Sequence, residues 1–260
     1  MLVGVPKEIK NNEYRVGLLP AGVRELIHHG HQVIVEAGAG DAIGFDDAAY
    51  AATGAEVVAA ADEVFARAEM IVKVKEPQQS ERVKLRDSQV LFTYLHLAPD
   101  LPQTRDLMTS GATCIAYETV TDSKGRLPLL APMSAVAGRM SIQAGASCLE
   151  KEHGGMGMLL GGVPGTHRGR VLIIGGGVVG HNAAQMAVGL GAQVTVIDKS
   201  LDVLADFDAR FGNRVQTLYS TQDAIIEQAL QADLVVGAVL VPGASAPKLV
   251  SREQIGRAHV

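Results

Sequence analysis

Three polar residues that could act on a small 2-oxo acid stand in the first half of the chain. Arg15, Lys75 and His96 each follow a short run of apolar, mostly β-branched residues. An arginine offers a planar fork that matches a carboxylate, and a lysine offers a point charge to a carbonyl oxygen. A histidine, which titrates near neutral pH, can transfer a proton. Taken singly, each also fits a structural role: an arginine in a surface ion pair, a lysine at a strand edge, a histidine in a loop.

A glycine-rich turn in the second half predicts a dinucleotide site. An apolar run leads into the sequence GGGVVG at 175–180, and a helical segment and a second apolar run follow. In such a loop Gly175 allows a tight turn, Gly177 lets the backbone approach a pyrophosphate, and Gly180 lets helix and strand pack closely. Asp198 ends the second run, near the spacing of a carboxylate that bonds the ribose hydroxyls. Its charge would repel a 2′-phosphate, so NAD is favoured over NADP.

Two parallel sheets are expected to position these residues. In the first half, strands are expected over 2–5, 32–35, 70–74, 90–93 and 113–116, in alternation with helical segments. In the second half they are expected over 171–174, 193–197 and 234–239. Strand–helix alternation of this kind predicts parallel α/β sheets, whose ligands lie at the carboxyl ends of the strands. A helix rich in small residues is expected over 134–153, and a glycine-rich stretch follows at 154–169. We place the domain boundary in or just before that stretch.

Composition narrows the class of protein. Of 260 residues, 47% are apolar and 20% are charged, a balance that excludes a disordered chain. A net charge of −5 gives no reason for non-specific attraction to nucleic acid. The longest apolar run, 234–241, is too short to span a bilayer, and the first residues lack the apolar region of a signal peptide. Two cysteines without a CxxC pair fit a reducing compartment, and no pattern indicates a metal site. A cytoplasmic protein with no nucleic-acid or membrane partner is expected.

Motifs along most of the chain resemble the alanine dehydrogenase and pyridine nucleotide transhydrogenase family. Those shared with the whole family are VGVPKE at 3–8, EYRV at 13–16, EAGAG at 36–40 and KVKEP at 73–77. Those specific to the alanine dehydrogenase branch are YLHLA at 94–98 and the combination of APMS at 131–134 with LGGVPG at 160–165. The resemblance extends from Met1 to about Gln254.

The resemblance implies reversible, NAD-dependent oxidative deamination of L-alanine to pyruvate and ammonium. Arg15 would bind the substrate carboxylate, Lys75 its carbonyl oxygen, and His96 would be the acid/base. Further residues implied to line the NAD site are Ser134, Val178, Val179, Asp198, Ser220, Val239 and Leu240, although from spacing alone Ser220 is an ordinary loop serine. A homohexamer is implied, in which the small-residue helix could form an interface. The expected fold has two parallel-sheet α/β domains, one flavodoxin-like for the substrate and one an incomplete Rossmann domain for NAD.

The end of the chain departs from the family. Residues 255–260 do not resemble it and coincide with one reading frame of a common sequencing-adapter oligonucleotide. We therefore expect a C-terminally truncated chain that lacks the family's catalytic aspartate and is itself inactive; a divergent natural C-terminus is the alternative. The expected divisions are a substrate domain at 1–133, a connecting helix at 134–153, a nucleotide domain at 154–254 and a non-native tail at 255–260.

Three other functions remain open at the level of sequence. They are the nucleotide-binding subunit of a transhydrogenase, a saccharopine-type dehydrogenase for a longer substrate, and a non-catalytic NAD-binding module. His96 within the motif YLHL argues against the first. Turnover of alanine with NAD distinguishes all three from an alanine dehydrogenase.

Overall fold

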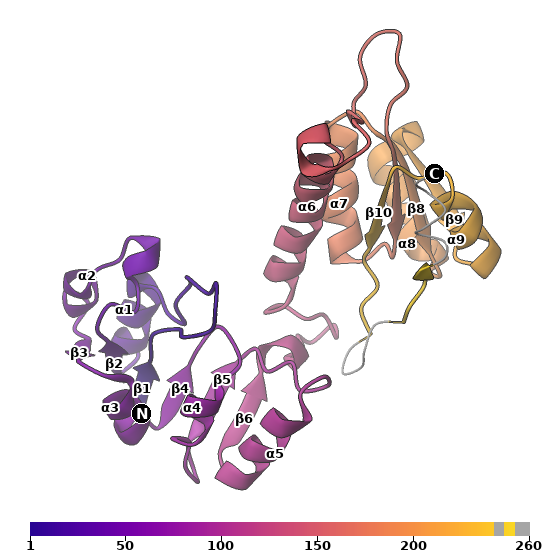
Figure 1. Ribbon diagram of the computed structural model, residues 1–260. Coiled ribbons are helices and arrows are strands. Elements are labelled where there is room, and N and C mark those ends of the chain that lie inside the picture. The colour runs from indigo at the N-terminus through magenta and orange to yellow at the C-terminus, as the bar shows by residue number, and fades with distance from the viewer. Residues whose placement is uncertain (242–246, 253–260) are drawn as a thin grey trace. The chain divides into compact units, whose positions relative to one another are not determined.

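Two folded units make up the chain, each built on one parallel sheet (Figure 1). The computed structural model describes residues 1–241 and 247–252. The units are Met1–Leu129 and Leu130–Val260. Because the division follows Leu129, the helix that we expected to connect the domains belongs to the second unit. The predicted class, two parallel-sheet α/β domains, is confirmed.

The first sheet has six parallel strands in the order β3-β2-β1-β4-β5-β6. They are β1 (Leu2–Val5), β2 (Gln32–Glu36), β3 (Glu56–Val58), β4 (Met70–Val72), β5 (Val90–Thr93) and β6 (Thr113–Ala116). The sequence predicted every strand except β3, and the five predicted strands, numbered among themselves, follow the flavodoxin order 2-1-3-4-5. The strand order reverses between β1 and β4, which makes this the topological switch point where ligands of such sheets bind.

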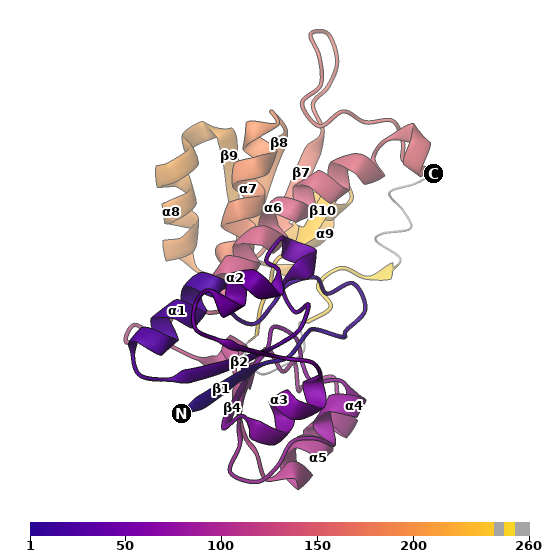
Figure 2. The same cartoon turned by 90° about the vertical axis from the view of Figure 1, so that its left-hand side faces the viewer.

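Helices cover both faces of the first sheet (Figure 2). They are α1 (Pro20–His28), α2 (Asp47–Ala51), α3 (Ala61–Arg67), α4 (Gln79–Arg82) and α5 (Leu101–Ser110), with short 3₁₀ turns at Asp41–Ile43 and Tyr117–Thr119. Along β2, Val33 and Val35 pack in a core with α1 and α2, whereas Ile34 packs in a second core with α3 and α5. Because both faces are buried, the strands read as continuous apolar runs.

The second sheet has four parallel strands among the described residues, in the order β10-β7-β8-β9. The strands are β7 (Arg170–Ile174), β8 (Gln193–Asp198), β9 (Val215–Tyr219) and β10 (Leu234–Gly237). The helices are α6 (Ala131–Cys148), α7 (Val178–Gly189), α8 (Leu201–Phe211) and α9 (Gln222–Ala229), with 3₁₀ turns at Lys151–His153 and Gly212–Arg214. One apolar core joins α6, α7 and α8 to the sheet, and a second joins α9 to its other face.

Small residues in α6 allow close packing within the second unit. A Cβ on Gly138 would lie 2.2 Å from the Val179 carbonyl oxygen of α7. The helix expected over 134–153 instead runs from Ala131 to Cys148, and a separate 3₁₀ turn follows. After this turn the chain folds back onto the end of the helix, where a Cβ on Gly155 would lie 2.2 Å from the Cys148 carbonyl oxygen.

The described residues include no helix long and apolar enough to cross a membrane. Within the same ranges, no group of three or more His, Cys, Asp or Glu side chains is arranged to hold a metal ion. The tail expected at 255–260 lies outside the described residues.

Candidate functional site

The carboxyl ends of β1, β4 and β5 carry the three polar residues predicted from the sequence. Arg15 lies in the loop after β1, Lys75 just after β4 and His96 just after β5. Two neighbours connect them. The hydrogen bond from Arg15 and, to a smaller extent, the charge of Lys75 lower the pKa of Glu13. Burial raises the pKa of Tyr94, and the charge of Arg15 opposes that rise. The Tyr94 ring stacks on His96 with centroids 6.2 Å apart. The three residues therefore follow three neighbouring strands of the first sheet, at the carboxyl end on which its switch point lies.

The guanidinium of Arg15 already holds a carboxylate, that of Glu13. Its Nε and Nη2 donate to Glu13 Oε1 and Oε2 at 2.8 and 2.6 Å, and the Arg15 backbone N–H donates to Oε1 at 2.9 Å. The Arg15 hydrogen bond lowers the pKa of the Glu13 carboxyl below its usual value. Both residues line a cavity of about 310 Å³. Because Arg15 is exposed, its fork can exchange Glu13 for the carboxylate of a small ligand.

A buried charge network lies beneath Lys75. Lys73 Nζ is 2.7 Å from Glu81 Oε1 and 3.2 Å from Glu8 Oε2, and all three side chains are almost completely buried. The other oxygen of Glu8 accepts the backbone N–H of Val74 at 2.6 Å and, more weakly, that of Lys75 at 3.4 Å. Burial raises the pKa of Glu8, against the opposing effect of the Lys73 charge. The network thus ties the loop after β1 to the end of β4.

The two lysines at the end of β4 therefore differ in what they can reach. The Lys73 ammonium group is buried and paired with Glu8 and Glu81. The Lys75 side chain is 17% exposed, and its ammonium group lies 3.5 Å from Glu76 Oε2. Of the pair, Lys75 is the more exposed lysine.

The glycine loop of the second unit makes a tight turn between β7 and α7. Gly175 has φ +105°, and a Cβ there would lie 2.8 Å from the Ala238 backbone that follows β10. A Cβ on Gly180 would lie 2.0 Å from the Gly175 carbonyl oxygen, so this glycine is required for packing. A Cβ on Gly177 would meet nothing within 4 Å. The protein itself does not require a glycine there, which fits a backbone position left bare for a phosphate.

Asp198 lies at the end of β8 and faces this loop. Its Oδ2 accepts the Gly176 N–H at 2.6 Å, and its Oδ1 accepts the Ser200 N–H at 2.8 Å. The Ser220 N–H donates to the Asp198 carbonyl oxygen at 2.9 Å, so Ser220 sits beside Asp198 at the same sheet edge. Each carboxylate oxygen keeps a second lone pair, and a ribose hydroxyl could donate to it.

The remaining residues implied by the resemblance lie at the start of α7, after β10 and in α6. Val178 and Val179 form the first turn of α7. The Val239 backbone lies against Gly175, and the exposed Leu240 follows it. Ser134 lies in α6, one helical turn before the glycine that contacts Val179.

A support for the loop that the sequence analysis did not identify is His181. Its Nδ1 lies 2.9 Å from the Gly176 carbonyl oxygen, and its Nε2 lies 2.8 Å from Asp206 Oδ2. The ring packs on Phe207 with centroids 3.9 Å apart. The position of His181 just after the glycine motif was the available signal, but the partner Asp206 lies 25 residues further along the chain.

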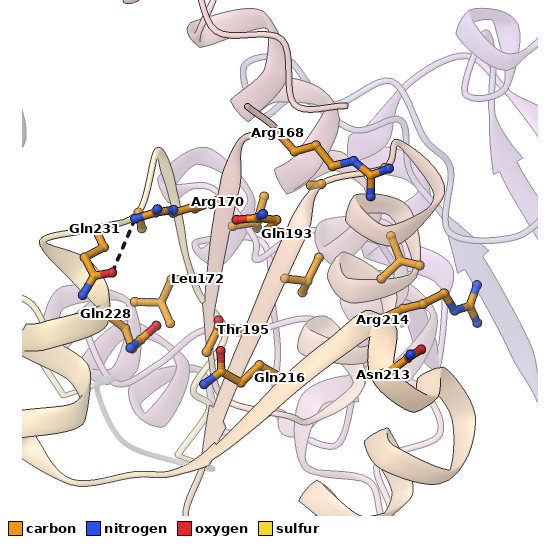
Figure 3. Close-up of a pocket in the computed structure, with 16 residues that line it drawn as sticks. Arg168, Arg170, Leu172, Gln193, Thr195, Asn213, Arg214, Gln216, Gln228 and Gln231 are labelled. Carbon is orange, nitrogen blue, oxygen red and sulfur yellow. Dashed lines mark hydrogen bonds between the residues drawn. The ribbon is translucent and has the colours of Figure 1, made fainter. Parts of the chain in front are cut away.

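A cavity of about 570 Å³ opens at the opposite edge of the second sheet, where the strands begin (Figure 3). Figure 3 shows Arg170 extended toward Gln231, whereas Arg168 and Arg214 extend toward the other side. The three guanidinium groups do not point toward one another, so they do not form a common binding site for an anion.

Comparison with known proteins identifies the family. Residues 4–137 match the model of the alanine dehydrogenase/PNT N-terminal domain, and residues 141–259 match that of the C-terminal domain. The alanine dehydrogenase of Halomonas elongata is 57% identical over 255 residues, which are 98% of this chain and 69% of the relative. That of Bacillus subtilis is 55% identical over 98% of this chain and 67% of its own length.

Two solved structures have the same fold. An L-alanine dehydrogenase superposes with a TM-score of 0.91 at 51% identity, covering 100% of this chain and 72% of that structure. A transhydrogenase from Sinorhizobium meliloti superposes with a TM-score of 0.81 over 100% of this chain and 76% of that structure; at 24% identity it shows the fold alone. The chain therefore belongs to the alanine dehydrogenase/PNT family.

Proposed function

We propose that this protein catalyses the reversible, NAD-dependent oxidative deamination of L-alanine to pyruvate and ammonium. The observation that carries the proposal is the placement of Arg15, Lys75 and His96 at the switch point of a chain that is 51–57% identical to several alanine dehydrogenases. The transhydrogenase alternative is supported only by a more distant match.

In the proposed reaction each residue has a separate task. Arg15 exchanges the Glu13 carboxylate for that of the substrate and fixes its orientation. The Lys75 ammonium group stabilises negative charge that develops on the substrate oxygen. His96 moves protons to and from the attacking water and the departing amine.

The glycine loop and Asp198 would hold NAD, whose nicotinamide accepts a hydride from the substrate Cα when it is bound. The bare backbone at Gly177 supports a pyrophosphate there, and the Asp198 carboxylate supports NAD over NADP. Ser134, Val178, Val179, Ser220, Val239 and Leu240 complete the proposed cofactor site.

The proposal includes assembly and location. A homohexamer rests on the family resemblance alone. Cytoplasmic location is supported by Cys114 and Cys148, both of which are free thiols. The net charge of −5 supports small molecules rather than nucleic acid as partners.

Steady-state kinetics of the complete gene product test this division of labour. His96→Ala should lower kcat by about 10²-fold or more, because proton transfer contributes on that order. Arg15→Ala should mainly raise the KM for alanine and pyruvate, and neither change should weaken NAD binding. Near-normal kcat in His96→Ala would contradict the proposed role of the histidine.

A further inference from the structure

The backbone of His96 has a conformation that few residue types adopt. Its φ is +49°, and the other non-glycine residues with positive φ in the described ranges are Asn12 and Ser88. Left-handed backbone conformations away from glycine persist only where the surrounding structure imposes them. The His96 side chain is exposed, so its own packing does not impose this one.

Hydrogen bonds to the backbone of Leu95 and His96 constrain this conformation. Glu118 Oε1 accepts the N–H of His96 at 2.7 Å and that of Leu95 at 3.1 Å, and Oε2 lies 3.2 Å from the Leu95 nitrogen. The Gln103 side-chain amide donates to the Leu95 carbonyl oxygen at 2.5 Å, and Gln103 is buried. Because the acceptor of the N–H groups is a carboxylate, these bonds are stronger than those between neutral groups.

Glu118 is itself held in place by its neighbour in the chain. It lies in the 3₁₀ turn Tyr117–Thr119 that follows β6. The Tyr117 ring packs edge-on against Phe92 and Tyr94, with centroids 4.3 and 4.9 Å away. The carboxylate is thereby fixed relative to the end of β5, from which His96 projects.

We propose that Glu118 is a positioning residue for His96: its carboxylate holds the Leu95–His96 backbone in the left-handed turn that presents the imidazole to the substrate. The inference deepens the proposed function and rests on it, because the role of His96 as the acid/base belongs to that proposal. Both Glu118 carboxylate oxygens accept backbone N–H groups of Leu95 and His96, so Glu118 would affect the reaction through the position of His96.

Kinetics of three variants of the complete gene product test the proposal first. Glu118→Ala should lower kcat by roughly 10²-fold, the loss expected when a reacting group is misplaced by about 1 Å. Glu118→Gln should lose less, because its amide oxygen can still accept an N–H. The matched control is Glu69→Ala, since Glu69 accepts the Leu2 N–H at 2.5 Å at the amino ends of β1 and β4, away from the candidate site. The control should keep kcat within about two-fold of the unmodified protein.

A double-mutant cycle separates positioning from general support of the fold. If Glu118 acts through His96, adding Glu118→Ala to His96→Ala should lower kcat no further. A second loss as large as the first would overturn the proposal, because a fold defect reduces activity whether or not His96 is present.

Amide hydrogen exchange tests, independently of catalytic activity, the clamp formed by the hydrogen bonds from the Leu95 and His96 amides to Glu118. The Leu95 and His96 amides should exchange slowly in the unmodified protein and at least about ten-fold faster in Glu118→Gln, the variant chosen in case Glu118→Ala does not fold. Unchanged exchange of both amides would overturn the inference. Absence of alanine turnover in the unmodified protein would instead contradict the proposed function, while the exchange result still decides whether the clamp exists.

Discussion

Replacement of Gly177 by alanine should separate cofactor binding from folding. Gly177 precedes α7 with φ −70°, a value open to any residue, and a Cβ there would meet no protein atom within 4 Å. Alanine gains about 0.4–1 kcal/mol of stability from the smaller entropy of the unfolded chain. It loses a comparable amount as a poorer N-cap than glycine. The free energy of unfolding should therefore stay within about 1 kcal/mol of the unmodified value.

Binding of NAD should respond differently. The added methyl group would occupy the space through which a pyrophosphate approaches the helix N-terminus. We expect the free energy of NAD binding to weaken by at least about 1.4 kcal/mol, which corresponds to a ten-fold or greater rise in Kd. Titration with NADH, followed by fluorescence, measures the Kd, and urea unfolding measures the stability.

Two further glycines serve as matched controls. Gly180→Ala should weaken both properties, because its Cβ would lie 2.0 Å from the Gly175 carbonyl oxygen and overpacking costs about 1–3 kcal/mol. Gly189 lies in the same helix, and a Cβ there would also meet no atom within 4 Å. Gly189→Ala should therefore change neither the stability nor the free energy of NAD binding by more than about 1 kcal/mol. Unaltered NAD affinity in Gly177→Ala would refute the assignment of this loop to the pyrophosphate.

Two other predictions concern charged groups. Asp198→Asn keeps an acceptor for the Gly176 N–H but loses the charge, so the ratio of the Kd values for NADP and NAD should fall toward one; equal affinity of the unmodified protein for both would count against this role. Burial raises the pKa of Glu8 above its ordinary 4.5, so the folded state favours protonated Glu8. That stability is present below pH 4.5 and is lost as pH rises through the raised pKa, with a slope of at most about 1.4 kcal/mol per pH unit. Urea unfolding across this range should show the unmodified protein losing stability relative to Glu8→Gln, whereas a constant difference would contradict the shift.

Elements with strong local signals could be predicted from the sequence. The strands β1, β5 and β6 begin and end at the predicted residues, since each is an apolar run between turns. The edge strand β3 was missed because it has only three residues, Glu56–Val58, in an alanine-rich segment. The end of α6 was placed too late because the 3₁₀ turn at Lys151–His153, which follows the end of the helix at Cys148, was taken as its continuation.

The groups that support the candidate site could not be predicted because their partners are distant in sequence. Lys73 and Glu8 are 65 positions apart, and Glu118 and His96 are 22 apart. Local patterns did indicate residues that follow strands, such as Lys75 after β4, because ligands of parallel sheets bind beyond the carboxyl ends of the strands. They carried no information on which carboxylate would hold which backbone N–H.

Oxidation of L-alanine by the complete gene product is the direct test of the proposed function. With NAD present, NADH, pyruvate and ammonium should form in equal amounts, and His96→Ala should form them at least about 10²-fold more slowly. Absence of alanine-dependent NADH formation in a folded protein that binds NAD would contradict the proposed function, and an undiminished rate in His96→Ala would contradict the role of the histidine.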